Sequence, residues 1–587
     1  MNKRIMIVKK EKCNPIGCGG YLCIRVSPSN RMGKDAIHKS DDGKVEVNEE
    51  VITDGDRIAA NKCPFNALEM INLPAELDKE PIHRYGKNGF ALFNLPTPIF
   101  GKVVGIVGCN GIGKSTAIKI LAGVLDPNLG RVEANAHVAT HEELIDYFKG
   151  TEAQMFFEKR KKGVVRVAYK PQQVDMIPKE FSGTVRDLLS KTDEKNRILE
   201  ITKELEIEKI LDHDIKKISG GELQRVAIAA TVLKKANIYF FDEPSSYLDM
   251  KQRLKVSKFI RGLADEETAV MVIEHDLIIL DYMTDFVHLM YGKEGAFGIV
   301  SMIKTTKAGI NVYLSGYLKE ENIRFRDHEI KFLKKPPISK KVEFEMVSWD
   351  ELEQDFGSFN LKVNSGKLYR SDTVGILGEN GIGKTSFVRI LAGVVDTKDK
   401  IEKLKVAYKP QYLEPNDELV MVVLKCALDK YQATIVNPLN LKGFLTKKLS
   451  ELSGGELQRV MIAKCLSEDS DIILMDEPSA YLDVEQRLIV SKVIKDVMEQ
   501  MGKSALIVDH DLLFIDYLSD RLIVFDGEPA VNGVVKGPFD MSEGMNKFLK
   551  DLELTFRRDD ENNRPRANKV NSQLDREQKS KGNLYYS

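Results

Sequence analysis

The sequence predicts an α/β fold in which two similar domains follow each other behind a smaller α+β domain at the N-terminus. Three observations lead to this prediction. A glycine-rich loop that follows an apolar strand and opens a helix occurs twice, at residues 108–115 and 378–385. A series of further motifs follows each loop in the same order. Four of the seven cysteines lie before residue 64 and mark the N-terminal domain.

The composition favours a multidomain protein of the reducing cytosol. A chain of 587 residues is too long for one hydrophobic core. Its net charge of −1 gives no overall attraction to nucleic acid or to an anionic membrane. No apolar run approaches the length of a spanning helix, and the first ten residues fit a short strand better than a signal peptide. The cysteines do not form a secreted disulfide pattern, so we expect a cytoplasmic protein.

Both glycine-rich loops fit the phosphate-binding pattern. Each follows an apolar strand, Val103 to Val107 in the first copy and Thr373 to Leu377 in the second. The glycines let backbone N–H groups surround phosphates, the lysine reaches the β- and γ-phosphates, and the hydroxyl after it binds Mg²⁺. The predicted nucleotide-binding residues of the loops are Asn110, Gly111, Gly113, Lys114, Ser115 and Thr116, and Asn380, Gly381, Gly383, Lys384, Thr385 and Ser386.

Five downstream motifs complete the repeat. In the first copy they occupy residues 168–172, 219–225, 238–244, 247–249 and 274–276, and in the second 407–411, 453–459, 472–478, 481–483 and 509–511. The Ser-Gly-Gly signature at 219 and 453 distinguishes one class of phosphate-loop ATPase from the others. On these motifs the chain resembles the ATP-binding cassette superfamily over most of residues 80–540.

The residue types of these motifs suit ATP hydrolysis. An apolar strand ends in Asp242 or Asp476, which delivers a buried carboxylate to Mg²⁺. The next residue is placed to polarise the attacking water as general base. The predicted roles are general base for Glu243 and Glu477, γ-phosphate and water sensing for His275 and His510, and completion of the metal and water shell for Gln172 and Gln411.

The resemblance also implies composite sites. In the superfamily, the signature serine and glycines of one cassette contact the γ-phosphate held by the other cassette, and a helix N-terminus suits that contact. The implied pairs are Lys114 with Ser453 and Gly455, and Lys384 with Ser219 and Gly221. ATP would then hold the two cassettes closed on each other.

Adenine needs a stacking surface, which an aromatic residue upstream of the loop provides in this superfamily. Tyr85 or Phe90 suits the first site. Phe356 or Phe359 suits the second, and we choose Phe359. Each of these rings could equally be a buried core residue.

The two copies differ by an insertion. The loops are 270 residues apart but Gln172 and Gln411 only 239, so the first copy carries 31 extra residues. Within the surplus, around 137–163, four apolar side chains could line one helical face before a basic run at 159–162; they are Leu144, Phe148, Phe156 and Phe157. The sequence leaves two interpretations open, an RNA-contacting arm and a solvated surface excursion.

An arginine-rich segment follows each copy. Phe325 lies between Arg324 and Arg326, and Phe556 precedes Arg557, with Arg564, Arg566 and Lys569 further on. The recurrence favours two roles over a plain solvated charge run. The segments could be hinges that brace the two lobes, or they could contact RNA phosphates.

The N-terminal cysteines indicate a family. Cys13, Cys18, Cys23 and Cys63 resemble a bacterial two-cluster ferredoxin domain that has lost half of its cysteines. Such a head before two cassettes resembles the ribosome-recycling class E of the ATP-binding cassette proteins, the RNase L inhibitor family, over essentially the whole chain. The resemblance implies a factor that splits ribosomes after termination or stalling with a release-factor-like partner. That factor then stays on the small ribosomal subunit, whose rRNA and proteins are its implied partners. Initiation factors are further possible partners there.

The resemblance further implies which cluster survives. In a two-cluster ferredoxin, each cluster takes three cysteines from one motif and the fourth from the other. Four positions of one cluster are replaced, namely Ser27, Thr53, Asp56 and Ala59, whereas the four cysteines that remain form the complete set of the other. We therefore expect one [4Fe–4S] cluster, with a structural Zn²⁺ or four inert cysteines as alternatives.

The expected organisation is an iron–sulfur domain at 1–75, a first nucleotide-binding domain at 76–310, a hinge at 311–340, a second nucleotide-binding domain at 341–540 and a second hinge with the tail at 541–587. We expect a monomer with both cassettes and no membrane partner. The sequence leaves two other functions as alternatives. A different soluble twin-cassette translation ATPase would have a long charged linker and no cysteine-rich head, and a transport ATPase would need a membrane subunit.

Overall fold

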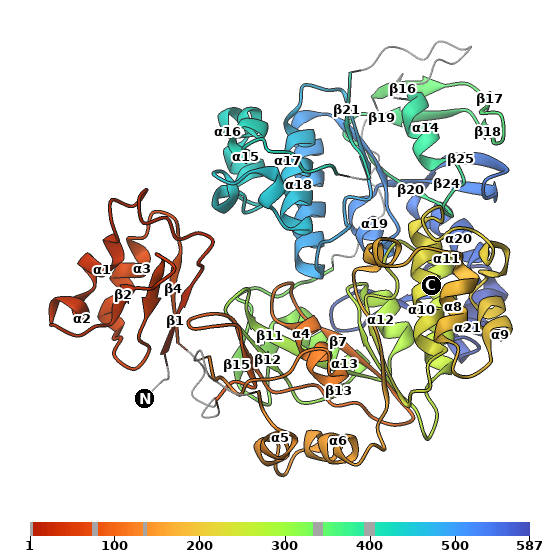
Figure 1. Ribbon diagram of the computed structural model, residues 1–587. Coiled ribbons are helices and arrows are strands. Elements are labelled where there is room, and N and C mark those ends of the chain that lie inside the picture. Colours follow the sequence, from red (N-terminus) through yellow and green to blue (C-terminus); the bar gives the residue numbers. More distant parts are fainter. Residues whose placement is uncertain are drawn as a thin grey trace.

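The protein is described by a computed structural model that covers residues 4–72, 80–132, 138–332, 344–391, 405–411 and 413–586. A small N-terminal lobe lies beside two larger α/β lobes (Figure 1). The expected domain boundaries at 75/76 and 340/341, residue 137 of the insertion and the last residue fall outside the described residues. No helix in these ranges is long and apolar enough to span a membrane.

The N-terminal lobe is a small α+β unit. Strand β1 (Arg4–Val8) pairs antiparallel with β4 (Leu68–Asn72), with Val8 opposite Leu68. Because successive side chains of a strand point to opposite faces, Met6 and Val8 pack in the lobe core while Ile5 and Ile7 belong to the large hydrophobic cluster shared with the cassettes. The other elements are α1 (Leu22–Val26), α2 (Pro28–Arg31), β2 (Ile37–Lys39), β3 (Val45–Val47), η1 (Asp54–Asp56) and α3 (Arg57–Asn61).

The first cassette is a mixed sheet covered by helices. Its central strands are parallel and fully buried, as expected for strands with helices on both faces. The strand order is β5-β6-β12-β11-β7-β10-β9-β8, with β13 paired to β11. The strands are β5 (His83–Arg84), β6 (Ala91–Phe93), β7 (Val103–Val107), β8 (Val167–Lys170), β9 (Ile238–Asp242), β10 (Ala269–Ile273), β11 (Phe286–Lys293), β12 (Phe297–Val300) and β13 (Lys304–Thr305).

Its helices are α4 (Lys114–Ala122), α5 (His141–Tyr147), α6 (Glu152–Lys161), α7 (Ile177–Glu180), α8 (Val185–Thr192), α9 (Ile198–Glu204), α10 (Gly220–Val232), α11 (Met250–Gly262) and α12 (Leu277–Met283), with η2 (Val174–Met176) and η3 (Glu208–Ile210). Helix α4 starts at Lys114, at the end of the first glycine-rich loop, which opens a helix as the motif predicted. The preceding strand, β7, has the bounds expected from its apolar run.

The second cassette repeats this topology with the order β17-β18-β25-β24-β20-β23-β22-β21, so the predicted pair of α/β domains is confirmed. Its strands are β17 (Leu352–Asp355), β18 (Asn360–Val363), β20 (Thr373–Leu377), β21 (Val406–Lys409), β22 (Ile472–Asp476), β23 (Ser504–Val508), β24 (Arg521–Glu528) and β25 (Asn532–Asp540), beside the pair β16 (Glu345–Trp349) and β19 (Gly366–Tyr369). Its helices are α14 (Lys384–Leu391), α15 (Val420–Val423), α16 (Lys425–Lys430), α17 (Gly454–Ser467), α18 (Val484–Met501), α19 (Leu512–Leu518) and α20 (Met541–Asp551), with η4 (Gln432–Val436), η5 (Lys442–Phe444) and η6 (Leu449–Glu451).

The insertion is a docked helix pair, α5 and α6. Its four apolar side chains are buried in one cluster with the sheet and α4; they are Leu144, Phe148, Phe156 and Phe157. The basic run is largely engaged within the protein. Arg160 donates to the carbonyl of Leu121 at the end of α4 (3.0 Å), Lys161 pairs with Glu142, and Lys159 lies over the Phe100 ring. These contacts weigh against a free RNA-binding arm.

The arginine-rich segments brace the cassettes. Arg566 pairs with Asp281 of α12 through Nε (2.7 Å) and with Asp559 (3.2 Å). Arg564 is fully buried and also faces Asp281. Arg326 pairs with Glu485 of the second cassette (3.0 Å). Buried guanidinium groups already paired with carboxylates are not available to RNA phosphates, so for these three arginines the bracing role is the one that the contacts support.

The elements of these segments are α13 (Thr306–Ser315), β14 (Tyr317–Leu318) and β15 (Ile323–Arg324) after the first cassette, and β26 (Phe556–Arg558), β27 (Pro565–Ala567) and α21 (Gln573–Lys581) after the second. The two segments contact each other. Asn311 of α13 donates to Glu561 (2.8 Å) and accepts from Asn562 (3.0 Å). The C-terminal region therefore packs against the first cassette and ties the ends of the two repeats together (Figure 1).

Candidate active site

The two phosphate loops have the same local geometry. Gly113 and Gly383 have φ angles of 89° and 93°, which disfavour any residue with a Cβ. A Cβ at Gly113 would also approach Phe90 to 2.7 Å, and one at Gly383 would approach Phe359 to 2.9 Å. Each loop therefore needs glycine both for its conformation and for the aromatic ring that supports it.

The loop lysines are held in place by the carbonyls of their own loops. Lys114 Nζ donates to the carbonyls of Gly108 (2.9 Å) and Cys109 (2.7 Å), and Lys384 Nζ donates to those of Gly378 (2.8 Å) and Glu379 (2.7 Å). Both lysines are buried, and burial lowers the pKa of Lys384 to about 8. A buried ammonium held by loop carbonyls supplies a positive charge for an anionic ligand.

The carboxylates predicted to bind the metal lie at the ends of β9 and β22. Thr385 Oγ1 donates to Asp476 Oδ2 (2.8 Å), so the predicted metal-binding hydroxyl and carboxylate are in contact. Burial raises the pKa of Asp242 to about 6, and the neighbouring Glu243 adds to this effect. Its buried Oδ1 accepts no hydrogen bond from the described residues, which leaves an acceptor for a cation. These oxygen ligands fit Mg²⁺.

The predicted general bases contact both of their predicted helpers. Gln172 Nε2 donates to Glu243 Oε1 (2.8 Å), and Gln411 Nε2 donates to Glu477 Oε1 (2.7 Å). The histidines approach the same oxygens, with His275 Nε2 at 3.3 Å and His510 Nε2 at 3.6 Å. The structure thus brings glutamate, glutamine and histidine together in both cassettes.

The two bases differ electrostatically. Burial raises the pKa of Glu477 to about 7, and the carboxylate of Asp509 adds to the rise. Burial acts in the same direction on Glu243, but the hydrogen bond with His275 and the nearby lysines outweigh it and lower the pKa to about 2. The shorter histidine contact in the first cassette accounts for part of this difference.

Each phosphate loop touches the opposite cassette. The backbone N–H of Asn110 donates to Asp483 Oδ2 (3.1 Å), and that of Asn380 donates to Asp249 Oδ2 (3.0 Å). The amide of Asn110 also donates to the carbonyl of Tyr481 (3.3 Å), whose ring lies beside Gly454 of the signature. The loop with Lys114 therefore faces the second cassette next to its signature, and the mirror contact exists at the other loop.

The signature serines begin helices, as predicted. Ser219 caps α10 and Ser453 caps α17, and in each case the serine Oγ accepts the backbone N–H of the glutamate three residues later. Gly221 and Gly455 lie in the first turns of these helices, so each signature presents a helix N-terminus with free N–H groups.

The two interfaces are not identical. Glu379 of the second loop pairs with Lys251 of the first cassette (2.7 Å). Cys109 stands at the matching position of the first loop, and Glu485, which matches Lys251, pairs instead with Arg326 of the hinge. One interface is thus joined directly by an ion pair, and the other is joined through the hinge segment.

The aromatic candidates form two matched pairs. Tyr85 and Phe90 have ring centroids 6.4 Å apart, as have Phe356 and Phe359. The rings of Phe90 and Phe359 pack against the loop glycines Gly113 and Gly383, whereas Tyr85 and Phe356 are 48% and 38% exposed. This geometry favours Tyr85 and Phe356 as the open stacking faces, so Phe359 fits a supporting role better than the stacking role predicted for it.

The sequence motifs predicted no role for a lysine and a glutamine in each cassette. Lys170 and Lys409 are buried, and so are Gln224 and Gln458 of the signature helices. All four make hydrogen bonds to the backbone of the catalytic motif. Their recurrence at matched places in both copies was the signal available in the sequence.

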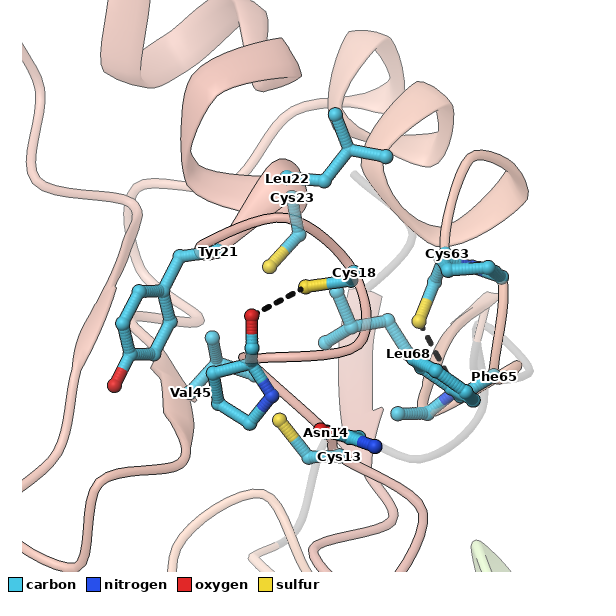
Figure 2. A pocket seen from close by; sticks show the side chains of 13 residues that line it. Cys13, Asn14, Cys18, Tyr21, Leu22, Cys23, Val45, Cys63, Phe65 and Leu68 are labelled. Carbon is cyan, nitrogen blue, oxygen red and sulfur yellow. Dashed lines mark hydrogen bonds between the residues drawn. The ribbon is translucent and has the colours of Figure 1, made fainter.

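The four N-terminal cysteines line one pocket (Figure 2). Their sulfur atoms lie around it, from the loop before α1, from α1 itself and from the turn after α3. Cys63 Sγ accepts the backbone N–H of Ala67 (3.3 Å), and burial raises the pKa of Cys23 to about 11. No three His, Cys, Asp or Glu side chains among the described residues converge closely enough to hold a single metal ion.

The substituted positions have become a hydrogen-bonded core. Asp56 is fully buried and accepts from the hydroxyls of Ser27, Ser29 and Thr53 and from the backbone N–H groups of Ser29 (3.1 Å) and Thr53 (2.8 Å). Ala59 is buried nearby in α3. Burial raises the pKa of Asp56, but these donors outweigh it and lower the pKa to about 2.

Replacing Asp56 with asparagine is expected to destabilise the N-terminal lobe by about 2 kcal/mol at pH 7. The asparagine NH₂ group would place two N–H donors against hydroxyl and N–H groups that already donate to this side chain. A folded pKa below the unfolded value means that this stability is present at neutral pH and is lost as the pH falls toward about 2. Hydrogen exchange of the β1 and β4 amides measures the change. Asp41→Asn, at an exposed position of the same lobe, is the control, and equal protection in both variants would contradict the expectation.

Comparison with known proteins identifies the family. The ABC transporter family matches residues 99–246 and 361–480. An uncharacterised ABC transporter ATP-binding protein of Methanocaldococcus jannaschii is 48% identical over 99% of this chain and 97% of its own length. Translation initiation factor RLI1 of Saccharomyces cerevisiae is 41% identical over 100% of this chain and 98% of its own length. A solved structure described as ribosome-bound archaeal Pelota and ABCE1 superposes with a TM-score of 0.93 at 49% identity and covers 100% of both chains.

The chain belongs to the class E family of ATP-binding cassette proteins, the RNase L inhibitor family. Both cassettes of this class E protein are of the ATP-hydrolysing type, so ATP and Mg²⁺ are its substrate and cofactor. The match covers the N-terminal lobe and the hinge segments as well as the cassettes. The resemblance inferred from the motifs is confirmed.

Proposed function

We propose that this protein is an ATP-driven ribosome recycling factor, which splits ribosomes into subunits after termination or stalling and then remains on the small subunit. The observation that supports this most directly is the likeness over 100% of the chain to a protein solved on the ribosome. The shared length includes the N-terminal lobe and the bracing segments, which ATP-binding cassettes of transporters have no reason to share.

The cycle depends on the contacts between the cassettes. ATP at both sites would favour the closed arrangement in which each phosphate loop meets the opposite Asp249 or Asp483. The N-terminal lobe would move with the first cassette, because Glu69 pairs with Lys293 and Arg84 with Glu49. Hydrolysis would remove the γ-phosphate and reopen the interface.

The proposed partners follow from the relatives. The ribosome-bound relative was solved with Pelota, so we propose a release-factor-like partner together with the small subunit, its rRNA and its proteins. The yeast relative is named a translation initiation factor, which makes initiation factors possible later partners. We propose that the protein acts in the cytoplasm as a monomer that carries both cassettes, without a membrane partner.

Sedimentation of ribosomes with the purified protein tests this function. With a non-hydrolysable ATP analogue we expect the protein to sediment with the small subunit, and with ATP and a release-factor-like protein we expect intact ribosomes to separate into subunits. Binding without ATP-dependent separation would favour another soluble twin-cassette translation ATPase. No ribosome binding under either condition would remove the proposal and leave a transport ATPase subunit as the alternative.

We propose in addition that Cys13, Cys18, Cys23 and Cys63 hold one [4Fe–4S] cluster. A structural zinc ion would need all four sulfurs at about 2.3 Å from a single point, whereas the sulfurs here surround a pocket. A four-iron cluster takes the same four thiolates but spreads them around its own volume. The Asp56 network occupies the positions of a second cluster, which supports one cluster and not two.

Iron and acid-labile sulfide of anaerobically purified protein are expected at about four of each per chain. Cys63→Ser should lower both, because it removes one thiolate from the set, whereas Cys426→Ser in the second cassette should leave them unchanged. About eight irons would mean that other ligands hold a second cluster. Zinc in place of iron would refute the cluster while leaving the four ligands in place.

A further inference from the structure

A buried lysine meets the backbone of the catalytic motif in each cassette. Lys170 ends β8, and its Nζ donates to the carbonyls of Asp242 (2.9 Å) and Glu243 (3.3 Å). Lys409 ends β21 and donates in the same way to Asp476 (2.7 Å) and Glu477 (3.3 Å). Their exposures are 0% and 1%. A fully buried ammonium is costly, so two such groups at matched places need a reason.

A glutamine from the signature helix meets the same carbonyl. Gln224 of α10 donates through Nε2 to the carbonyl of Glu243 (2.7 Å), and Gln458 of α17 donates to that of Glu477 (2.7 Å). Both side chains are fully buried, and their Oε1 atoms have no hydrogen-bond partner among the described residues. The bond to the glutamate carbonyl is therefore the contact that orients each amide.

The glutamates need such support. Glu243 and Glu477 have φ angles of 48° and 47°, a left-handed conformation that is unfavourable for a residue with a side chain. Such conformations persist only where the surroundings fix them. The backbone N–H of each glutamate donates to the next strand, to Ile273 (3.0 Å) or Val508 (2.7 Å). The lysine and the glutamine fix the carbonyl, so both peptide groups around the glutamate are held.

We propose that Lys170 with Gln224, and Lys409 with Gln458, are positioning residues that hold the left-handed backbone of the general base and so direct its carboxylate toward the attacking water. The inference rests on the proposed roles of Glu243 and Glu477. It also gives the signature helix a second task. Helix α10 is capped by Ser219, which is the phosphate contact proposed for one ATP site, and through Gln224 it touches the general base of the other site.

The test isolates one site. In a Glu477→Gln background only the first site turns over, and there Lys170→Met and Gln224→Leu are compared. Lys170→Met is expected to lower kcat about 10–100-fold and Gln224→Leu about 3–10-fold, while the Kd for ATP changes less than about twofold, because only the orientation of the base is lost. Thr231→Val is the matched control on the same helix, because among the described residues the Thr231 hydroxyl bonds only to the carbonyl of Ala227 within α10.

The same variants are then placed in a Glu243→Gln, Glu477→Gln background. If the pair acts through the glutamate, neither variant lowers the residual turnover further. Equal losses in both backgrounds, or an unchanged kcat for both variants in the first, would overturn the inference. If Lys170→Met does not fold, Gln224→Leu decides alone. Full turnover in the Glu243→Gln, Glu477→Gln protein itself would instead remove the proposed catalytic roles.

Discussion

The protein with both Glu243→Gln and Glu477→Gln is expected to lose on the order of 10²–10⁴ in kcat for ATP hydrolysis while it still binds ATP. Glutamine has nearly the shape of glutamate and keeps the contacts with Gln172 and Gln411, but it cannot accept a proton from water. Phosphate release at saturating ATP measures the loss, and equilibrium binding of a labelled ATP analogue measures the retained affinity.

Single variants divide this effect between the sites. Each should stop turnover at its own site only, and the doubly substituted protein should accumulate in the closed form on small ribosomal subunits. The matched control is Glu321→Gln, because Glu321 lies outside both sites and accepts from Tyr291 in the hinge region. Undiminished hydrolysis in the doubly substituted protein would show that neither glutamate is the general base.

The second large effect is coupling across the interface. In a Glu477→Gln background, Lys114→Ala and Ser453→Ala are each expected to lower the remaining turnover by about 10²-fold, because each removes a donor to the same γ-phosphate. The combination should cost little more than either change alone, because members of one unit are strongly non-additive. The reason lies in the contacts of Asn110, which place the first phosphate loop against the signature side of the second cassette.

The control cycle exchanges the partner. In the same Glu477→Gln background, Ser219→Ala should leave the remaining turnover nearly unchanged, with or without Lys114→Ala, because Ser219 caps α10 in the same cassette as Lys114 and is assigned to the other site, which is already stopped. The mirror cycle in a Glu243→Gln background pairs Lys384 with Ser219. Coupling confined to residues of one cassette would mean that the sites are not composite.

Sequence reasoning was strongest where chemistry restricts the residue type. The strand bounds of β7 and β20, and the presence of a helix after each strand–loop unit, could be predicted because a phosphate loop tolerates little change in spacing. The insertion was located from spacing alone, but its role was not. Whether the basic side chains of 159–162 are available to a ligand depends on neighbours such as Leu121 and Glu142. Both residues come well before this run in the sequence.

The sequence by itself determined the two cassettes, their catalytic motifs, the family and the four cysteines, because each is a local pattern of residues with a fixed chemical use. Only the tertiary structure decided which arginines brace the cassettes, how the two interfaces differ, and that Lys170 and Gln224 converge on the carbonyl of Glu243. These features depend on burial and on contacts between segments up to several hundred residues apart. Spacing along the chain does not encode such contacts, because packing brings the partners together only in the folded protein.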